Sequence, residues 1–183
     1  LGVMLVLFAP TSGAADEPKR GGTLVYVLGG APQNLNRSLS VVHFDAVAAS
    51  PVMEGLIRVE RHTGKIQPVL AAKWSISKDG LTYVFNLRKG VTWHDGKPYT
   101  AEDVVFTFKK MLPFHPASSG LLARMKSVKA LDNFTVEITL TEPFAPLLIS
   151  LTEENVAIQP KHVFEGKDIV TNPANLAPVG TGP

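Results

Sequence analysis

The chain contains 183 residues, 45% of them hydrophobic, and its 18 basic residues nearly balance its 16 acidic ones. A chain of this length and composition can bury a substantial core, so we expect a globular protein. No block of like charges interrupts the sequence. The composition therefore excludes the basic surface by which nucleic acid is bound.

The first residues have the pattern of the end of a secretory signal peptide. An apolar run, Leu1–Phe8, is followed by the small residues Gly13–Ala15 and a polar start at Asp16, as at a signal-peptide cleavage site. The run is too short to span a bilayer, and a buried N-terminal strand is the alternative. The chain has no cysteine, so no thiol is available for a lipid anchor or a disulfide. We expect an exported, periplasmic protein that is not lipid-anchored.

The next part of the chain predicts a strand, a helix and a hairpin. The β-rich run 24–28 is closed by glycines and predicts a buried strand. Apolar residues at helical spacing predict a helix over 43–56, which Pro51 interrupts. A strand, a turn at Thr63–Gly64 and an extended return are expected over 55–77.

The stretch 79–99 predicts a half-buried strand and a tight turn. Alternate residues point to one face of the strand: Tyr83, Phe85 and Leu87. Asp95-Gly96 readily supplies the positive backbone angle of a turn that begins at His94. His94 and Asp95 could instead form an acid–base pair, but no nucleophile stands beside them in the sequence. We therefore prefer the turn.

The clearest helix prediction begins at Thr100. Its hydroxyl is placed to cap the first turn, Asp103 stands three residues on as in a capping box, and acidic residues favour this end of a helix. One continuous apolar face comprises Ala101, Val104, Val105, Phe108, Met111 and Leu112. This spacing predicts a helix that runs to Leu112.

The second half predicts a hairpin followed by short elements. Strict alternation over 134–140, after a turn at Asp132–Asn133, predicts the hairpin. A helix, a strand and a helical turn follow: Phe144–Leu151, 156–160 and Lys161–Phe164. Glu153 and Glu154 could be an acid pair or metal ligands, but adjacent residues on a helix end do not face each other, so we expect solvated side chains. Together the elements predict an α+β (mixed α/β) fold.

The order of several segments is similar to that of a known family. The segments are "MEGLIRV", "VLAAKWSISKDGLTYVFNLRKGVTWHDGKPYTAEDVVFTFKK", "VEITLTEPFAPLL" and "PVGTGP". They closely resemble the peptide, dipeptide and nickel class of extracellular solute-binding proteins, solute-binding family 5, which feed ABC importers. The likeness runs from about Gly21 to the last residue.

The resemblance implies a periplasmic-binding-protein-like type II bilobal receptor, of which this sequence is an N-terminal fragment with the first lobe only. Residues 1–15 would be the signal-peptide remnant, and 16–58 with 160–183 would form the ligand-bearing lobe. Residues 59–159 would be a subdomain inserted into that lobe. Without the second lobe, we expect this part alone neither to close nor to bind tightly.

Ligand contacts are expected on loops held by rigid elements. On the resemblance, one such loop brings Ser40, Val41, Val42 and His43 to the ligand. Its two valines stand where some family members have an acidic residue, which argues against a cationic ligand side chain. His43 could instead be a surface residue at the start of a helix. A second candidate loop contains Ser118, Ser119 and Gly120.

We therefore expect a receptor and not an enzyme, with no catalytic residue, cofactor or metal site. It would act as a monomer, capture a small solute such as a short peptide, and deliver it to the membrane subunits of an ABC permease. Two alternatives remain open. The same scaffold could bind an opine-like conjugate, a sugar or a metal chelate, or the chain could be the support domain of an exported hydrolase.

Overall fold

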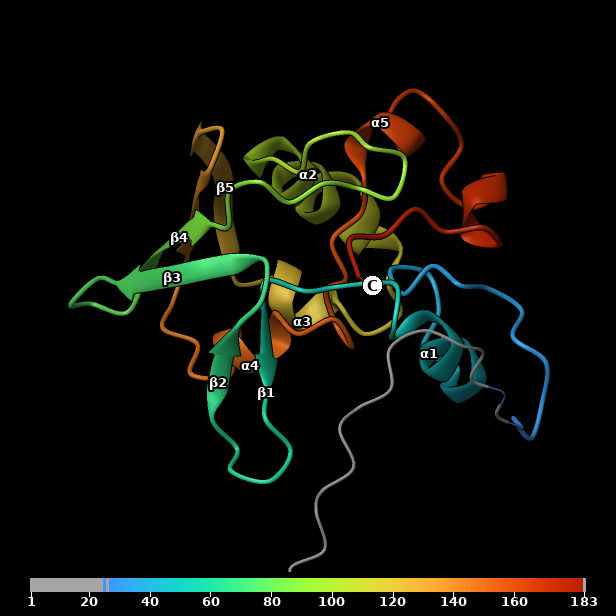
Figure 1. Ribbon diagram of the computed structural model, residues 1–183. Coiled ribbons are helices and arrows are strands. Elements are labelled where there is room, and N and C mark those ends of the chain that lie inside the picture. Colours follow the sequence, from blue (N-terminus) through green and yellow to red (C-terminus); the bar gives the residue numbers. More distant parts are fainter. Residues whose placement is uncertain (1–24, 26, 183) are drawn as a thin grey trace, which may run out of the picture.

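Figure 1 shows the computed structural model of the protein, which describes residue 25 and residues 27–182. The expected signal-peptide remnant lies outside the described residues, as do two residues of the strand expected at 24–28. The rest of that expected strand is in no strand, and Val25 and Val27 are 82% and 95% exposed. The expectation is wrong for these residues. A strand is buried only when a neighbouring strand pairs with it, and no described strand does so here.

Four antiparallel strands form the main sheet, in the order β3-β4-β6-β5. They are β3 (Ala71–Ile76), β4 (Thr82–Leu87), β5 (Met125–Asp132) and β6 (Thr135–Leu140). Alternate residues of β4 and β6 are buried, and Phe85 lies opposite Val136. This confirms both the predicted alternation and the predicted hairpin.

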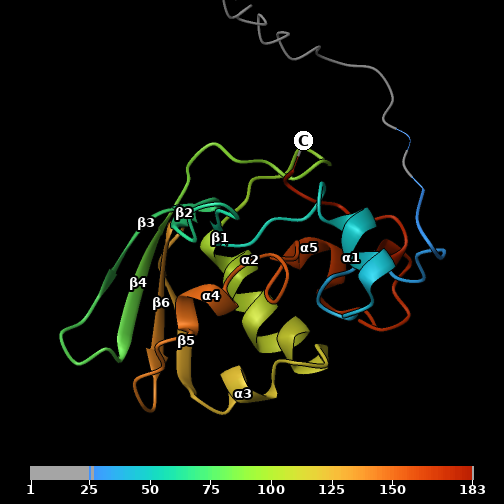
Figure 2. The ribbon, with the colours of Figure 1, turned by 90° about the horizontal axis from the view of Figure 1, so that it is seen from below.

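Helices cover the buried face of this sheet. Figure 2 shows α2 (Ala101–Phe106) and α4 (Leu147–Ser150) on the same side of the strands. The predicted apolar face is buried, with Val105 partly exposed, but it serves two clusters. Met111 packs with Phe106 and Phe164, whereas the other members join the main core.

The helix changes its winding after Phe106, where the sequence predicted a continuous helix. Residues Thr107–Met111 form a π-helix, and Leu112–Phe114 form a 3₁₀ turn. The Thr107 hydroxyl donates to the Asp103 carbonyl at 2.8 Å and accepts from the Gln159 backbone N–H at 2.9 Å. A side chain that inserts into the backbone hydrogen bonds of a helix is a known cause of such a change of helix type.

The predicted cap at the start of α2 also connects distant parts of the chain. Thr100 N donates to Asp103 Oδ2 at 2.9 Å, the contact that the acidic residue makes in a capping box. The same buried carboxylate accepts from Lys161 N at 2.9 Å and from Trp93 Nε1 at 3.4 Å. Asp103 therefore joins three segments.

The first helix and the small hairpin occur where they were expected. Helix α1 (His43–Ala49) ends shortly before Pro51, earlier than the predicted span, because proline cannot continue the helical hydrogen bonds. Strands β1 (Ile57–Val59) and β2 (Ile66–Pro68) pair in antiparallel fashion. Gly64, in the turn between them, has a φ of +67°.

Short elements complete the fold. They are α3 (Ser119–Leu122), α5 (Lys161–Phe164) and a 3₁₀ turn at Pro173–Asn175. Helix α5 matches its prediction, whereas the strand expected at 156–160 is a buried segment without a ladder. Ile158 N donates to Glu54 O at 2.9 Å, but Gln159 N turns to the Thr107 side chain instead. A backbone satisfied by such single contacts needs no strand partner.

Buried polar contacts fix the loop that precedes α1. Asn36 Nδ2 donates to Asn175 Oδ1 at 2.9 Å, and Leu35 N donates to the Asn175 carbonyl at 2.7 Å. The Ser38 hydroxyl donates to Ala157 O at 3.3 Å. The loop is thus held against segments more than a hundred residues later in the chain.

The turn predicted at His94–Gly96 is confirmed, and His94 contacts residues 180–182, at the end of the described chain. Gly96 has a φ of +82°. His94 N donates to Gly180 O at 2.9 Å, and His94 Nε2 lies 2.6 Å from Gly182 O. The chain also passes so close to Val52 that a Cβ on Gly180 would lie 2.0 Å from the Val52 carbonyl oxygen. His94 therefore has a structural role.

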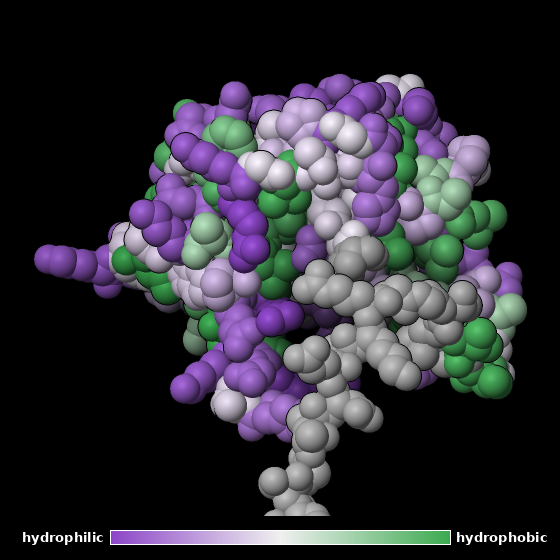
Figure 3. All heavy atoms as spheres, viewed as in Figure 1, coloured by the Kyte–Doolittle hydropathy of each residue, from purple (hydrophilic) through white to green (hydrophobic). Residues whose placement is uncertain are grey.

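Exposed apolar residues occur in several parts of the molecule. Figure 3 shows green residues at the right, on the side where Figure 1 shows α1 and the 165–182 segment, and others at the centre and left. Exposed apolar residues in this part of the sequence include Val41, Val42, Val170 and Leu176. Within the described residues, no helix has both the length and the apolar character needed to cross a membrane.

Candidate functional site

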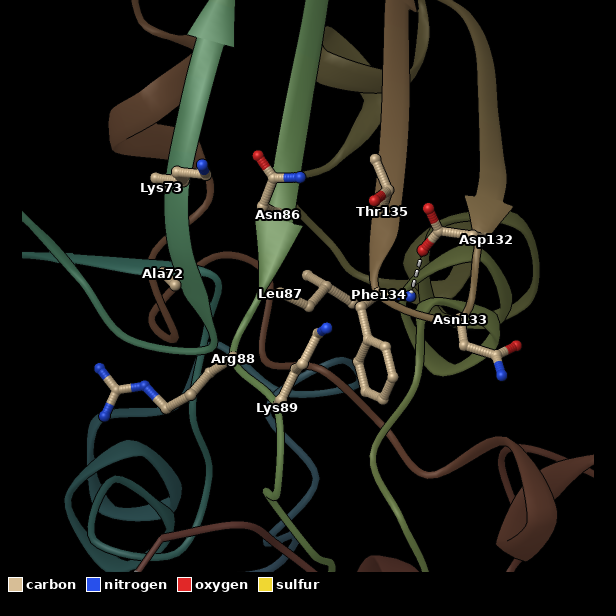
Figure 4. A pocket seen from close by; sticks show the side chains of 10 residues that line it. All are labelled: Ala72, Lys73, Asn86, Leu87, Arg88, Lys89, Asp132, Asn133, Phe134 and Thr135. Carbon is tan, nitrogen blue, oxygen red and sulfur yellow. Dashed lines mark hydrogen bonds between the residues drawn. The ribbon is translucent and has the colours of Figure 1, made fainter.

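A broad hollow of about 860 Å³, the sheet hollow, lies at one end of the main sheet (Figure 4). Its lining residues are Ala72, Lys73, Asn86, Leu87, Arg88, Lys89, Asp132, Asn133, Phe134 and Thr135. The Lys89 ammonium lies 5.5 Å from the centroid of the Phe134 ring, and Asp132 Oδ1 accepts from Phe134 N at 2.7 Å. Its cationic side chains are solvent-exposed, and exposed charges on an open surface bind weakly.

A more enclosed cleft of about 470 Å³, the loop cleft, lies between α1 and four loop segments. Its lining residues are Arg37, Val41, His43, Ala46, Val47, Ser50, Arg61, His115, Ala117, Glu153, Glu154 and Asn155. Cationic and anionic side chains from separate parts of the sequence thus face one space. A few convergent polar groups in a concave surface are the usual features of a ligand site.

Arg37 provides a nearly buried positive charge beside this cleft. It is 6% exposed, and its Nη1 and Nη2 atoms donate to Ser40 O at 2.8 Å and Glu154 O at 2.9 Å. Burial lowers the pKa of the guanidinium, although nearby carboxylates oppose this shift, and an arginine stays protonated. Among the described residues, Arg37 takes part in none of the ion pairs. Its charge is therefore held by carbonyl oxygens and is not neutralised by a contacting carboxylate.

Ser40 and Asp45 shape the loop that leads into α1. The Ser40 hydroxyl donates to Asp45 Oδ2 at 2.5 Å and accepts from Val42 N at 3.1 Å, while Gln33 N donates to Asp45 Oδ1 at 2.7 Å. Burial works to raise the pKa of the Asp45 carboxyl, but the hydrogen bonds from Ser40 and Gln33 outweigh it and lower this pKa. Asp45 is therefore an ionised anchor that fixes the direction of the loop.

His115 is a neutral histidine at the inner wall of the loop cleft. It is 5% exposed, and its Nδ1 accepts from Ala117 N at 3.2 Å, which places the ring proton on Nε2. This Nε2 is buried and has no hydrogen-bond partner among the described residues. Burial, and then the charge of Arg37, lower the pKa of His115. The ring is thus an uncharged hydrogen-bond donor near neutral pH.

A smaller cavity of about 180 Å³, the apolar recess, adjoins the loop cleft between α3 and α4. Its lining residues are Leu112, His115, Ala117, Ser118, Gly120, Leu121, Arg124, Phe144, Ser150, Asn155 and Val156. His115, Ala117 and Asn155 line both cavities. The two cavities therefore meet at His115.

The structure brings parts of both predicted ligand loops to these adjoining cavities. Val41 and His43 line the loop cleft, and Ser118 and Gly120 line the apolar recess. The two loops are about seventy-five residues apart in the sequence. Their convergence depends on the fold and not on sequence spacing.

Three of the predicted residues have other positions. Ser40 is buried and its hydroxyl is engaged with Asp45, while Val42 and Ser119 are exposed and line neither cavity. Ser40 thus positions the loop and does not face the cleft.

The sequence analysis missed the charged groups of the loop cleft. Arg37 lies in the predicted ligand loop, but nothing in its neighbours shows that its side chain is buried. Glu153 and Glu154 were expected to be solvated, and although they are partly or fully exposed, they line the cleft. Within the described part of the chain, no three histidine, cysteine, aspartate or glutamate residues gather as a metal site.

A mixed α/β fold with a cleft lined by loops from distant segments is typical of ligand-binding proteins. The chain belongs to the bacterial extracellular solute-binding proteins, family 5, because the model of the middle part of that family matches residues 65–183. This confirms the resemblance found in the sequence. The family consists of solute-binding proteins, so the chain belongs to a class of binding proteins and not of enzymes.

Curated relatives match nearly the whole chain. The dipeptide-binding protein of Escherichia coli (strain K12) is 36% identical over 202 aligned residues, which cover 98% of this chain and 37% of the relative. Heme-binding protein A of Haemophilus influenzae is 34% identical, with 96% and 36% covered. The chain therefore spans little more than a third of the length of these relatives.

Solved structures of such proteins share the fold. NikZ from Campylobacter jejuni, in complex with Ni(L-His), is 34% identical with a TM-score of 0.73, and the match covers 84% of this chain and 30% of NikZ. The substrate-binding protein CtaP from Listeria monocytogenes is 32% identical with a TM-score of 0.74, and 85% and 32% are covered. The mixed α/β fold thus matches part of a family 5 binding protein.

Proposed function

We propose that this chain is part of an extracytoplasmic receptor that captures a short peptide and delivers it to the membrane subunits of an ABC permease. Membership of the solute-binding family supports a binding role. Curated relatives named for dipeptides and di/tripeptides support a peptide as the solute. Binding would shift an equilibrium between open and closed forms, and the permease would recognise the closed form.

The observation that carries this proposal is the mixture of charges in the loop cleft. Arg37 and Arg61 line it together with Glu153 and Glu154, and His115 adds a neutral donor. A short peptide is a zwitterion, with a cationic amino end, an anionic carboxyl end and amide groups between them. A cleft with charges of both signs and a hydrogen-bond donor suits such a ligand better than it suits an apolar solute.

The proposed architecture is a type II bilobal receptor. Residues 16–58 and 160–183 would belong to the ligand-bearing lobe, and 59–159 to the inserted subdomain, since the main sheet lies wholly within 71–140. The hydrogen bonds from Leu35 and Asn36 to Asn175 support a lobe made of two chain segments. A second lobe, outside this chain, would cover the apolar surface near α1 and complete the clamp.

The proposed location is the periplasm. Residues 1–15 have the pattern of a signal-peptide remnant. We propose that the receptor acts as a monomer, because hinge closure around a solute needs one copy only.

Ligand-dependent thermal unfolding of the full-length gene product tests this function. The probes are di- and tripeptides, and a ligand that binds only the native state stabilises it by about 2.7 kcal/mol at a hundredfold excess over Kd. Mass spectrometry should recover the peptide unchanged. Hydrolysed peptide would contradict the receptor function and favour an exported hydrolase, against which the family already argues.

The alternative solutes are tested in the same assay. Relatives and solved structures of this family include a heme-binding protein and proteins in complex with Ni(L-His) or mannopinic acid. Nickel–histidine, heme and an opine are therefore the comparison ligands. Stabilisation by one of these, with no response to any peptide, would assign this scaffold to that solute instead.

A further inference from the structure

The loop cleft and the apolar recess differ in chemistry although they share a wall. The cleft carries charges of both signs, from Arg37, Arg61, Glu153 and Glu154. The recess has one charged residue, Arg124, beside the apolar residues Leu112, Leu121, Phe144 and Val156. The boundary between them is His115, which lines both. A ligand that fills both cavities must therefore be polar in one part and apolar in the next.

We propose that the two cavities form one two-part site, in which the loop cleft holds the backbone of a peptide and the apolar recess takes one aliphatic side chain of it. This proposal rests on the peptide-receptor function proposed above and names the class of peptide. His115 donates its Nε2 proton to a carbonyl oxygen of the peptide at the junction.

The size of the recess supports an aliphatic side chain. Its volume of about 180 Å³ exceeds the roughly 30 Å³ that one water molecule occupies in the liquid. Leu112, Leu121, Phe144 and Val156 form the apolar part of its lining, where water finds few hydrogen-bond partners. A branched aliphatic side chain gains from leaving water there.

The state of His115 supports a carbonyl group at the junction. Its Nδ1 is occupied by Ala117 N, and its Nε2 is shielded from water with no acceptor among the described residues. A buried donor without a partner is costly, so an acceptor that reaches it is stabilising. A peptide carbonyl is such an acceptor, and it lies next to a side chain along the peptide.

Calorimetric titration of the full-length gene product with four tripeptides tests the proposal. Gly-Gly-Gly is the reference, and Leu-Gly-Gly, Gly-Leu-Gly and Gly-Gly-Leu place one aliphatic side chain at each position. At least one leucine peptide should bind about tenfold or more tightly than the reference, as expected for burial of a leucine side chain.

Gly120→Leu provides the variant that blocks the recess. Gly120 lines the recess, and an added Cβ would have only the far end of the Arg124 side chain nearby, at 3.9 Å. In this variant the affinity for the preferred leucine peptide should fall to that for Gly-Gly-Gly, so that the ratio of the two affinities is close to one. The matched control is Ser119→Leu, which adds the same side chain one residue earlier, at an exposed position that lines neither cavity. The control should keep the preference.

Two substitutions of His115 distinguish the effect of losing its Nε2 donor from the effect of changing the shape of its side chain. In His115→Asn the amide oxygen can replace Nδ1 and keep the contact with Ala117, but the Nε2 donor is lost. All four peptides should then bind about tenfold more weakly. In His115→Gln the amide nitrogen can replace the Nε2 donor, so its affinities should stay closer to those of the wild type. Equal losses in both variants would overturn the carbonyl contact.

The outcomes distinguish this inference from the function on which it rests. Binding of peptides without a preference for leucine, or with a preference that survives Gly120→Leu, would overturn the two-part site and leave the peptide receptor intact. Failure to bind any peptide would overturn both.

Discussion

Replacing Asp103 by alanine should destabilise the fold strongly, although the residue lies outside the proposed site. Its carboxylate accepts from Thr100 N, Lys161 N and Trp93 Nε1, and it is buried. Loss of a helix cap alone costs about 0.5–2 kcal/mol. A buried donor left without an acceptor costs about 1–3 kcal/mol more. We expect Asp103→Ala to lower the free energy of unfolding by roughly 4 kcal/mol.

Thermal unfolding and hydrogen exchange measure this effect. For a chain of this size, 1 kcal/mol changes the Tm by about 2–4 °C, so the Tm of the full chain should fall by about 8–16 °C. The backbone amide of Lys161 should also exchange faster in Asp103→Ala, because it loses its acceptor.

Glu102→Ala is the matched control for this substitution. Glu102 is the exposed neighbour of Asp103, and its carboxylate forms an ion pair with Lys161 Nζ at 3.1 Å. Exposed ion pairs contribute about 0.2–1 kcal/mol, so the Tm should change little. If Asp103→Ala is no more destabilising than Glu102→Ala, the assignment of Asp103 as a three-way connection is wrong.

Three further predictions concern a close backbone contact, a titrating group and a loop residue. Gly180→Ala should unfold the segment after residue 178, because its Cβ would lie 2.0 Å from a carbonyl oxygen, whereas Gly120→Ala, where the space is open, should keep or slightly raise the Tm. The pKa of His115 is lowered in the folded state. As the pH falls below about 6.5, the His115 ring therefore takes up a proton in the unfolded chain before it does so in the folded chain. The wild type should therefore lose stability as the pH falls from 7 to 5, and a urea titration should show a smaller loss for His115→Gln; equal losses would contradict the lowered pKa. His43→Ala removes an exposed ring that lines the loop cleft, so the Tm should change by less than the equivalent of about 0.5 kcal/mol. Weaker peptide binding at unchanged Tm would show that His43 contacts the ligand. Unchanged binding would make His43 a surface residue.

The strands and the main helix could be predicted because their burial is one-sided. Alternation in β4 and β6, and the apolar face that begins at Ala101, follow directly from packing against one core. Turns at Gly64 and Gly96 could be predicted because few residues other than glycine adopt their backbone angles.

The errors arose where tertiary contacts replace local ones. The segment 156–160 has the composition of a strand, but its backbone is satisfied by a single contact to Glu54 and by the Thr107 side chain. The change of winding begins at Thr107, whose hydroxyl makes this same long-range contact with Gln159 N. Neither has a signal in the local sequence.

The candidate site likewise has parts that could be predicted from the sequence and parts that could not. Members of both loops that were predicted from the sequence and the family resemblance line adjoining cavities, and their contact with a ligand stays a prediction. The buried state of Arg37 could not be foreseen, because it results from contact with a segment far along the chain. Nor could the Nε2 of His115, which is buried without a partner in the part of the chain that the structure describes. Site chemistry of this kind is visible only once the backbone is placed.

The hydrogen bonds from Leu35 and Asn36 to Asn175 have a consequence for the order of events during synthesis. A ribosome releases the chain from its N-terminus, and residue 36 emerges long before its partner, 139 positions later. The hairpins of the main sheet have their partners close by and can form early, whereas closing so long a loop is entropically slow. The wall of the cleft that carries Arg37 should therefore be among the last parts to become ordered, and a nascent chain paused before residue 175 would already have a sheet but not yet a receptor surface.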